Sequence, residues 1–570
     1  MTKRLKYQFR EEQAKLEIGH TEFSRGVKWT LFTVGLFTLF SVPTVQTYLE
    51  LRQHARGRRE NARSRFNDIF EALPRAAAAH GEHNGHWISK AFRGNAVILQ
   101  AIDKYEKDLK AESFLTQFVL PPTQEMLVHA GSGNEKAYVG RRQWLFYRPG
   151  IDYCTGPGFL NPRQMDRRAE SGTRWQAPPQ PDPRAAILQF HRQLAERDIR
   201  LVIMPTPDKA TIHPEEFSSR YEGERVSVHN PSYWKLLDEL QTEGVLVCDV
   251  TETLAQYRNR SGNASYLATD THWRPEAMRL AAAELARLIE DRIVLGATAT
   301  DRDWRQTSRN VKNLGDIAMM LNLRQSQGVF NEETVTIRPV LDALGRPWRP
   351  DPAAEILVLG DSFANIYSLP MMNWGSAAGL TEQLSYSLRR PVDVILRNDD
   401  GAYATREMLS RELARGEDRL DGKKVVVWQF AARELAVGDW KLFDMTLKQS
   451  REPAERPPPA DRELIVSGTI AAKSPAPRAG QMPYAHHIFT LDLTDLQVRG
   501  GTLSEPKIAV HLFSMRNHQN TPAFSWPVGK RVKLKLLPWK PRFFAQYGRI
   551  NRTETDDVEL ERPWWGEVIE

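Results

Sequence analysis

The stretch Glu355-Ile-Leu-Val-Leu-Gly-Asp-Ser-Phe-Ala-Asn-Ile-Tyr367 decides the fold of this chain. Residues 356–359 form an apolar run that is long enough for a buried strand and too short for a helix. Gly360 and Asp361 end the run, and Ser362 begins a helix-compatible segment. This order exposes the hydroxyl of Ser362 at a sheet edge, beside the free N–H groups of a helix N-terminus. Ser362 is therefore a candidate nucleophile and, through its backbone N–H, a candidate oxyanion donor. The alternative is that Ser362 only caps the helix.

A serine nucleophile needs a base, and the base needs a carboxylate to hold it; Thr269-Asp-Thr-His-Trp273 offers both. In an extended segment, residues i and i+2 point to the same side. Asp270 can therefore hold one imidazole nitrogen of His272 and leave the other for Ser362. The alternative is an accidental Asp-x-His pair on the surface. The position of the pair, between a strand-like run at 244–250 and a helix-like run from 274, favours the catalytic interpretation.

The middle of the chain alternates predicted helices and strands. The strands are expected at 199–205, 245–249, 356–359, 392–396 and 424–428, and the helices at 184–197, 232–241, 274–290 (with Pro275 near its start) and 405–413. Continuous β-branched runs separated by helices predict a parallel sheet covered on both faces. Active residues of such folds gather beyond the carboxyl ends of the strands. We place Ser362, Asp270, His272, Asn398 and Arg433 at this edge.

Four segments together resemble the SGNH-hydrolase-like polysaccharide O-acetyltransferases of the alginate acetylation family. They are Asp270-Thr-His-Trp273, Gly360-Asp-Ser-Phe363, Trp144-Leu-Phe-Tyr147 and Val425-Val-Val-Trp-Gln-Phe-Ala-Ala-Arg433. In ordinary SGNH esterases the Gly-Asp-Ser block comes first, whereas here it follows the Asp/His block, as in this circularly permuted acetyltransferase family. The resemblance covers residues 141–448. It implies an α/β fold with an SGNH-like parallel sheet flanked by helices, and a serine acetyl-enzyme that uses Ser362, His272 and Asp270.

The function that the resemblance implies is transfer of acetyl groups to hydroxyls of a polysaccharide outside the cytoplasm, with no metal and no soluble cofactor. Because acetyl-CoA is not available there, it also implies a membrane-bound O-acyltransferase as the acetyl-donating partner. Two alternatives stay open. One is a carbohydrate acetylesterase, in which water replaces the sugar as acceptor. The other is a non-catalytic polysaccharide-binding scaffold with a vestigial triad.

Further candidates lie near the same edge. Asn398 is a candidate side-chain oxyanion donor, with a turn asparagine as its alternative. The asparagine block that ordinary SGNH enzymes carry after their third conserved strand is missing here, because that strand ends at Gln429-Phe-Ala-Ala-Arg433. Arg433 either binds an anionic sugar or pairs with neighbours of Glu434. Candidate sugar-stacking residues, each with core packing as the alternative, are Tyr367, Trp273 and Trp374.

Near the N-terminus, residues 29–48 form a mostly apolar run without a charge, after a charged tail at 1–28. Twenty helical residues span about 30 Å, the thickness of one hydrocarbon core. Trp29 and Tyr48 fall where interfacial aromatic residues belong. A small-x-small cleavage site is missing, which favours a transmembrane anchor over a cleaved signal peptide. Lys and Arg flank both ends of the run, so the placement of a single-pass protein in the inner membrane, with its bulk in the periplasm, depends on the family resemblance.

The remaining sequence suggests three further domains and one linker. We expect a helical stalk or cap at 49–140, an acetyltransferase domain at 141–450 and a small all-β domain at 462–570. A proline-rich linker at 451–461 joins the last two. Runs of period two at 464–470, 488–493, 508–513 and 532–536 predict strands of a barrel or sandwich. His486-His487 lacks metal-ligand spacing and is interpreted as polar surface at a strand edge. The aromatic residues that crowd this end pack a core or form a carbohydrate-binding face: Trp539, Phe543, Phe544, Tyr547, Trp564 and Trp565.

The charge balance is mildly basic. Lys and Arg number 78 and Asp and Glu 71, which gives a net charge of +7 and a pI near 9.2. This suits contact with an anionic polymer or with lipid headgroups, but the charge is too dilute to predict a nucleic-acid partner. Cys154 and Cys248 supply neither a disulfide framework nor a metal site.

Overall fold

The computed structural model describes residues 24–55, 98, 102 and 113–569, with gaps at 172–177, 225, 297–302, 325–327, 399–400, 449–462, 478–485, 502, 504, 518, 539–549 and 556–562. The chain forms two compact units, Met1–Pro121 and Pro122–Glu570. The predicted linker at 451–461 and most of the predicted stalk at 49–140 lie outside the described residues.

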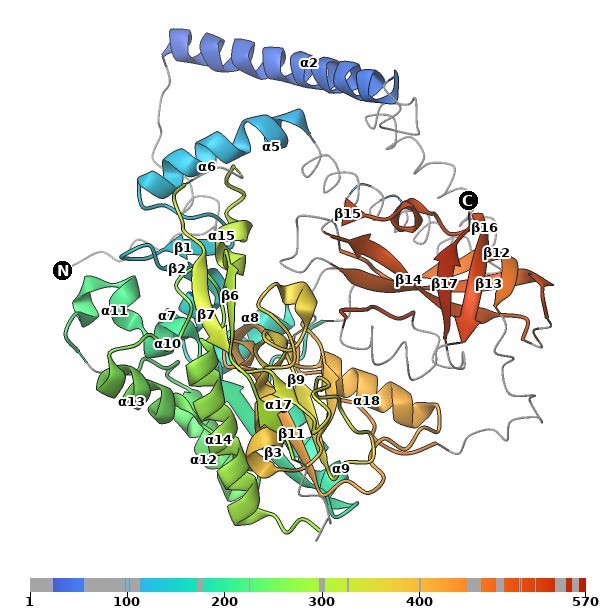
Figure 1. Ribbon diagram of the computed structural model, residues 1–570. Coiled ribbons are helices and arrows are strands. Elements are labelled where there is room, and N and C mark those ends of the chain that lie inside the picture. Colours follow the sequence, from blue (N-terminus) through green and yellow to red (C-terminus); the bar gives the residue numbers. More distant parts are fainter. Residues whose placement is uncertain are drawn as a thin grey trace, which may run out of the picture. The chain divides into compact units, whose positions relative to one another are not determined.

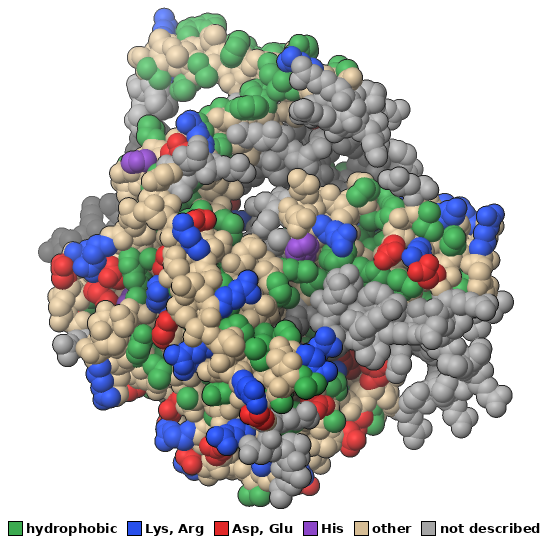
Figure 2. Space-filling model, viewed as in Figure 1, with side chains coloured by type: hydrophobic (Ala, Val, Ile, Leu, Met, Phe, Trp, Pro, Cys, Tyr) green, Lys and Arg blue, Asp and Glu red, His purple; other side chains and the backbone are tan. Residues whose placement is uncertain are grey.

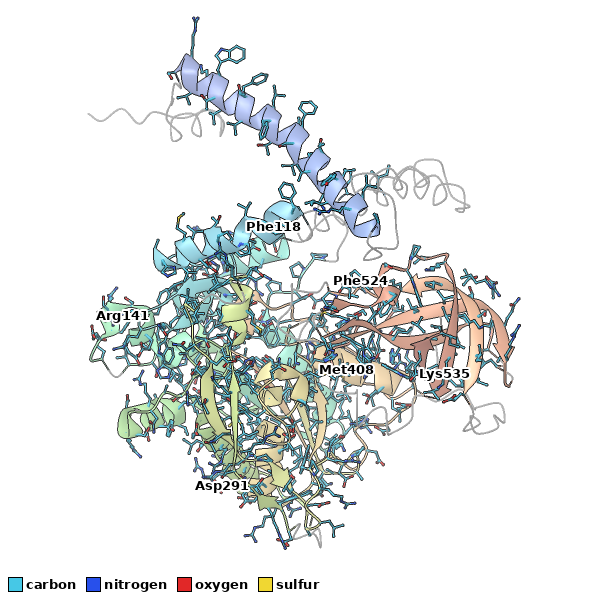
Figure 3. The ribbon with its side chains drawn as sticks, turned by 45° about the horizontal axis from the view of Figure 1, so that its top comes forward. Phe118, Arg141, Asp291, Met408, Phe524 and Lys535 are labelled. Carbon is cyan, nitrogen blue, oxygen red and sulfur yellow. The ribbon has the colours of Figure 1, made fainter. Side chains whose placement is uncertain are left out.

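In the first unit, α2 (Arg25–Ala55) contains the predicted anchor. Its stretch Arg25–Arg52 is long and apolar enough to cross a membrane. Residues 25–40 are all exposed, whereas Gln46 and Glu50 are buried. Hydrophobic side chains appear in green along α2 in Figure 2. Four threonine hydroxyls donate to carbonyls one turn earlier, so these polar groups are satisfied inside the helix: Thr30, Thr33, Thr38 and Thr44. By length and composition, the helix is compatible with a single-pass anchor. Phe118, at the end of α5 (Phe114–Phe118), is also exposed (Figure 3).

The second unit is built around the predicted parallel sheet (Figure 1). Its order is β10 (Asp393–Leu396), β9 (Ile356–Gly360), β11 (Val425–Ala431), β3 (Arg200–Thr206) and β4 (Leu246–Val247), and all the pairs are parallel. Every residue of β9, β10 and β11 is buried, which explains why their sequences are continuous apolar runs rather than alternating ones. The predicted α/β class is confirmed.

Helices flank this sheet at the predicted places: α9 (Pro183–Ala195), α12 (Tyr233–Thr242), α14 (Pro275–Arg292) and α18 (Ala404–Ala414), together with α17 (Leu380–Leu388). Pro275 opens α14, where its fixed φ and missing N–H are tolerated. Shorter elements are α6 (Leu120–His129), α7 (Arg148–Thr155), α8 (Pro162–Ala169), α10 (Lys209–Ile212), α11 (Pro214–Phe217), α19 (Glu434–Val437), β5 (Arg305–Gln306) and β8 (Val340–Leu341).

Several elements that position the site were not predicted. Helix α13 (Thr251–Ser261) separates β4 from the loop that carries Asp270 and His272, so this loop does not follow a strand directly. The hairpin β6 (Arg309–Asn313) and β7 (Glu333–Ile337) encloses α15 (Asp316–Met320). In the segment Trp144–Tyr147, β2 (Leu145–Tyr147) pairs with β1 (Ala137–Val139), and positive φ values at Arg142 and Gln143 make the turn between these two strands.

The predicted all-β domain is a closed, barrel-like sheet. Its strands are β12 (Leu464–Lys473), β13 (His487–Arg499), β14 (Ile508–Arg516), β15 (Gln519–Asn520), β16 (Arg531–Pro538) and β17 (Trp564–Val568). They follow the order β13-β12-β16-β17-β14-β15, and a pairing of β13 with β14 closes the sheet. Lys535 on β16, which is labelled in Figure 3, pairs with Glu463 and Glu567.

The structure of the all-β domain contradicts the prediction made for His487. His487 is fully buried, and its Nδ1 lies 2.7 Å from Ser514 Oγ. Burial, together with the charge of Arg397, lowers the pKa of His487 to about 3. The interpretation of His487 as polar surface is therefore wrong. Of the crowded aromatic residues, Trp565 is buried, whereas residues 539–549 lie outside the described part of the chain.

Candidate active site

Ser362 is the first residue of α16 (Ser362–Asn365), directly after the turn that ends β9. Asp361 caps this helix, because its Oδ1 accepts a hydrogen bond of 2.8 Å from the N–H of Phe363. The alternative that Ser362 is the cap therefore fails, and its hydroxyl is not used for capping. Gly360 is needed at the turn, since a Cβ there would lie 2.8 Å from Ala364 Cβ.

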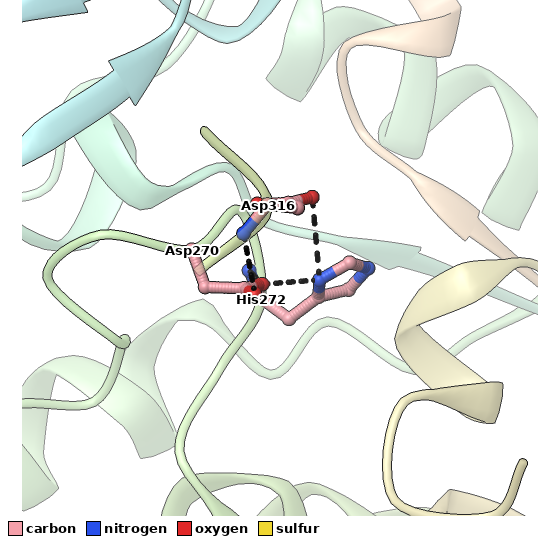
Figure 4. A group of neighbouring side chains, drawn as sticks. All are labelled: Asp270, His272 and Asp316. Carbon is pink, nitrogen blue, oxygen red and sulfur yellow. Dashed lines mark hydrogen bonds and ion pairs between the residues drawn. The ribbon is translucent and has the colours of Figure 1, made fainter. Parts of the chain in front are cut away.

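His272 and Asp270 form the expected pair. The Nδ1 of His272 lies 2.6 Å from Asp270 Oδ1, and both residues are buried (Figure 4). Because an ionised carboxylate only accepts, Nδ1 carries the proton and Nε2 is left with its lone pair. This Nε2 is buried and has no hydrogen-bond partner among the described residues. The imidazole is therefore held with an unprotonated nitrogen that can accept a proton.

Four N–H groups hold the carboxylate of Asp270. Its Oδ1 accepts from Nδ1 and from the backbone N–H of His272, and its Oδ2 accepts from Trp374 Nε1 at 2.9 Å and from the N–H of Asp316 at 3.0 Å. Burial alone would raise the pKa of Asp270, but the charge of His272 and these hydrogen bonds lower it to about 2. Burial would likewise lower the pKa of His272, but Asp270 chiefly raises it above its ordinary value. Both pKa shifts favour the charged forms of the pair, a carboxylate beside an imidazolium.

The two candidate segments meet in the fold although they are far apart in sequence. Phe363 is the residue after Ser362, and the centroid of its ring lies 4.8 Å from the centroid of the His272 ring. Trp273 Nε1 donates to the carbonyl of Phe363 at 3.1 Å, and the Tyr367 hydroxyl donates to the carbonyl of Trp273 at 2.6 Å. Within the described residues, His272 Nε2 and Ser362 are not hydrogen-bonded. Such catalytic hydrogen bonds are often long in unliganded enzymes and tighten with substrate.

Asp316 is the residue of this cluster that the sequence did not reveal. Its Oδ2 lies 3.9 Å from Nδ1 of His272 (Figure 4). Gly315 makes this approach possible, because a Cβ at this position would lie 2.2 Å from the carbonyl carbon of Thr269 and 2.4 Å from the nitrogen of Asp270. A glycine whose backbone crosses another backbone gives no local sequence signal, so the pattern around Gly315 did not single it out.

We expect Gly315→Ala to disrupt this cluster. The added methyl group would force the backbone of residue 315 away from Thr269 and Asp270, at a cost of about 1–3 kcal/mol. The melting temperature should fall, and the rate at which the protein hydrolyses an acetyl ester should fall at least about tenfold. Thermal unfolding and ester hydrolysis measure both effects. Gly35→Ala is the matched control, since a Cβ there meets nothing within 4 Å; equal behaviour of the two variants would contradict the close approach.

The three candidate sugar-stacking residues are core residues in this structure. Trp273, Trp374 and Tyr367 are at most 1% exposed. Their polar atoms donate to the carbonyl of Phe363, to Asp270 and to the carbonyl of Trp273. The core alternative therefore agrees with the structure, and Trp374 also holds Asp270. No ring face of the three is available to a sugar.

Asn398 follows β10 and lies against α16. Its Oδ1 accepts from Asn365 Nδ2 at 2.9 Å, and its backbone N–H donates to Asn551 Oδ1 at 3.0 Å. Its Nδ2 is buried and without a hydrogen-bond partner in the described part of the chain. Gln429, in contrast, has its Nε2 committed to Thr206 and Asp361. Asn398 thus offers a donor where Gln429 does not.

Arg433 follows β11 and is buried. Its Nη1 lies 3.0 Å from Asp208 Oδ1, and its guanidinium lies 5.7 Å from the ring centroid of Phe363 and 5.2 Å from that of Tyr147. Burial would lower the pKa of Arg433, but the charge of Asp208 raises it overall. The pairing partner is therefore Asp208 rather than a neighbour of Glu434.

The ligand atoms of Asp270, His272 and Asp316 all lie within 4.8 Å of one another, a spacing that an ion would also accept. However, both oxygens of Asp270 and Oδ1 of Asp316 already accept protein N–H groups. These oxygens are thus already engaged by hydrogen bonds within the protein, and we do not assign the cluster to a metal.

Comparison with known proteins identifies the fold family. The family model described as the SGNH hydrolase-like domain of the acetyltransferase AlgX matches residues 137–432, slightly more than half of the chain. This chain belongs to the AlgX family. The matched region contains Asp270, His272, Asp316 and Ser362, and the family resemblance read from the sequence is confirmed.

Among curated relatives, the chain is 24% identical over 264 residues to the probable alginate O-acetylase AlgJ of Pseudomonas fluorescens, covering 45% of this chain and 62% of that protein. It is 26% identical over 310 residues to the AlgJ of Pseudomonas aeruginosa, covering 52% and 73%. The match thus spans less than two thirds of the first of these AlgJ relatives. The O-acetyltransferase domain of Pseudomonas putida AlgJ, a solved structure, is 20% identical with a TM-score of 0.40, covering 53% of this chain and 93% of that domain.

Proposed function

We propose that this protein is a membrane-anchored, extracytoplasmic enzyme that transfers acetyl groups to hydroxyls of a polysaccharide through an acetyl-enzyme at Ser362. The observation that carries the proposal is the geometry of His272. Its Nδ1 is held by a buried carboxylate, its Nε2 is free, and its ring packs against the residue after Ser362. Membership of the AlgX family favours acetyl transfer as the reaction.

In the first half-reaction, Nε2 of His272 takes the proton from Ser362 Oγ while Oγ attacks the carbonyl carbon of the acetyl donor. Asp270 stabilises the resulting imidazolium. The N–H of Ser362 and Nδ2 of Asn398 are the proposed donors to the oxyanion. The bond from the acetyl carbon to the leaving group then breaks, and the leaving group takes the proton from His272. Ser362 is left as an acetyl ester.

In the second half-reaction, a sugar hydroxyl replaces the leaving group. His272 takes the proton of this hydroxyl as its oxygen attacks the acetyl carbon, and then returns the proton to Ser362 Oγ as the ester bond breaks. The acetylated sugar and free Ser362 are the products. Arg433, which lies beside Phe363, is the proposed contact for an anionic sugar.

The acetyl donor and the location follow from the same proposal. The curated relatives are named alginate O-acetylases, which supports a polysaccharide as acceptor. The helix α2 is long and apolar enough to cross a membrane. We propose that it anchors the protein in the inner membrane, with the catalytic unit in the periplasm. We propose that a membrane-bound O-acyltransferase supplies the acetyl group there. The barrel-like C-terminal domain is a proposed carbohydrate-binding unit.

The test is acetyl release with and without an acceptor. The full-length protein in detergent is given a chromogenic acetyl ester, alone and with an oligosaccharide. We expect release of the chromophore in both cases, and acetylated oligosaccharide whose amount rises with acceptor concentration. Hydrolysis without any acetylated sugar would instead identify the acetylesterase alternative, and no release at all would favour the non-catalytic scaffold.

A further inference from the structure

Asp316 brings a second buried carboxylate to the imidazole of His272. Its Oδ2 lies 3.9 Å from Nδ1 of His272, whereas its Oδ1 accepts hydrogen bonds from the N–H and the hydroxyl of Thr271 at 2.7 and 3.1 Å. Asp316 is 8% exposed and Asp270 is 2% exposed. The same edge of the imidazole therefore faces two carboxylates, of which Asp270 makes the hydrogen bond (Figure 4).

The backbone of Asp316 is part of the same arrangement. Its N–H donates to Asp270 Oδ2 at 3.0 Å, and the N–H of Gly315 donates to the hydroxyl of Thr269 at 3.2 Å. The N–H of Ala318 donates to the carbonyl of Thr269 at 3.2 Å. These three hydrogen bonds hold the start of α15 against the loop that carries Asp270 and His272. The distance from Asp316 to His272 is therefore set by several contacts.

Other charged groups also lie near these two carboxylates, and they include the buried cation Lys209. The charged groups near the cluster among the described residues include Asp361 at the start of α16, Lys209 on α10, Glu333 on β7 with its partner Arg274, and Arg433 with its partner Asp208. Asp361 adds a further negative charge. The Nζ of Lys209 donates to the carbonyls of Leu145 and Ala268, and its charge is attracted to those of Asp270 and Asp316 without a hydrogen bond to either. His272, in contrast, is hydrogen-bonded to Asp270.

Two buried carboxylates side by side are unfavourable while the imidazole is neutral. Burial and the charge of Asp270 raise the pKa of Asp316 to about 6. The repulsion is offset when His272 gains a proton, because the imidazolium then places a positive charge beside both carboxylates. Interactions that strengthen only in the transition state accelerate a reaction, and the imidazolium forms in the transition state for acetylation of Ser362.

We propose that Asp316 is a positioning residue that makes His272 a stronger base, by stabilising its imidazolium from Nδ1 and by fixing Asp270 through its backbone N–H. No proton moves to Asp316 in this role, and the proton of Ser362 still passes to Nε2. The inference rests on the proposed function, since it assigns Asp316 to the reaction of Ser362. It goes beyond that function by making a fourth residue set the pH range of the reaction.

The expected pH dependence follows from the sign of the charge. Acetylation needs neutral His272, so the rate should fall as the pH drops through the pKa of this residue. Because this pKa is raised, the midpoint of the fall (the acid limb of the pH–rate profile) should lie above the ordinary histidine value of about 6.5. Removing the negative charge of Asp316 lowers the pKa of His272, so the limb should move to lower pH by about one unit. The plateau rate should fall about tenfold, because the base is weaker.

The experiment uses the full-length protein in detergent and 4-nitrophenyl acetate in single turnover, between about pH 5 and pH 9. The rate of acetyl-Ser362 formation is compared in wild type, Asp316→Asn and Asp316→Ser. Both variants keep an oxygen that can accept from Thr271 and lose the charge. Asp303→Asn, at an exposed aspartate, is the matched control and should leave the limb unchanged.

A limb that moves to lower pH in a variant with the wild-type melting temperature supports the inference. A limb that stays in place overturns it, whatever happens to the plateau. If neither variant keeps the wild-type melting temperature, Asp316 serves folding and the inference is likewise overturned. Failure of the proposed function is distinguishable, because Ser362→Ala would then still form the acetyl-protein in the same assay.

Discussion

Ser362→Ala is expected to reduce acetyl-ester turnover at least about 10³-fold and to remove O-acetylation of the polymer in cells. The variant loses the only atom that the proposed mechanism acetylates, while the cap of α16 is made by Asp361 and remains. The helix and the sheet edge should therefore be unchanged. Ester hydrolysis by the purified protein and the acetyl content of the polymer from a complemented deletion strain are the two measurements.

The melting temperature of Ser362→Ala should lie close to that of wild type, which separates loss of the nucleophile from loss of the fold. Ser261→Ala is the matched control, because Ser261 is exposed and its hydroxyl bonds only within its own helix end. Unchanged acetyl content with Ser362→Ala would remove the enzyme hypothesis and leave a polysaccharide-binding role.

Asp270→Asn is expected to lower the rate of Ser362 acetylation by about 10³- to 10⁴-fold. All four acceptor positions of Asp270 face N–H groups, so an amide NH₂ must oppose either His272 or the pair of donors from Trp374 and Asp316. If it opposes His272, the imidazole keeps its proton on Nε2 and cannot act as a base. Single-turnover acetylation by a chromogenic ester measures the loss.

The same substitution should destabilise the protein if the amide turns toward Trp374 and Asp316, since two buried donors would lose their acceptor. The melting temperature therefore reports which orientation the amide takes. Asp303→Asn again serves as the exposed control. A rate within about threefold of wild type would contradict the role of Asp270 as the group that holds the tautomer of His272.

Local patterns were enough to predict most of the fold. The strands of the parallel sheet are buried on both faces, so their sequences are continuous apolar runs that can be found without any knowledge of their partners. The contact between Asp270 and His272 was also predictable, because a spacing of two residues in an extended loop is sufficient to bring the side chains together.

What the sequence could not show depends on contacts between distant segments. Asp316 reaches Thr271 across 45 residues, and Trp374 reaches Asp270 across 104 residues. Neither contact leaves a periodic signal. Trp273 and Trp374 illustrate a second limit, since an aromatic residue near an active loop has the same sequence whether it stacks on a sugar or packs in the core; their burial decides it. The prediction for His487 was wrong for the same reason, since its sequence does not show that the side chain is buried.

The most direct test of the central claim is mass spectrometry of the full-length protein after brief exposure to an acetyl ester, followed by proteolysis. We expect one added acetyl group on the peptide that contains Ser362. The same peptide should remain unlabelled in Ser362→Ala and in His272→Ala. An acetyl group found on another residue, or labelling of Ser362 that does not depend on His272, would contradict the account.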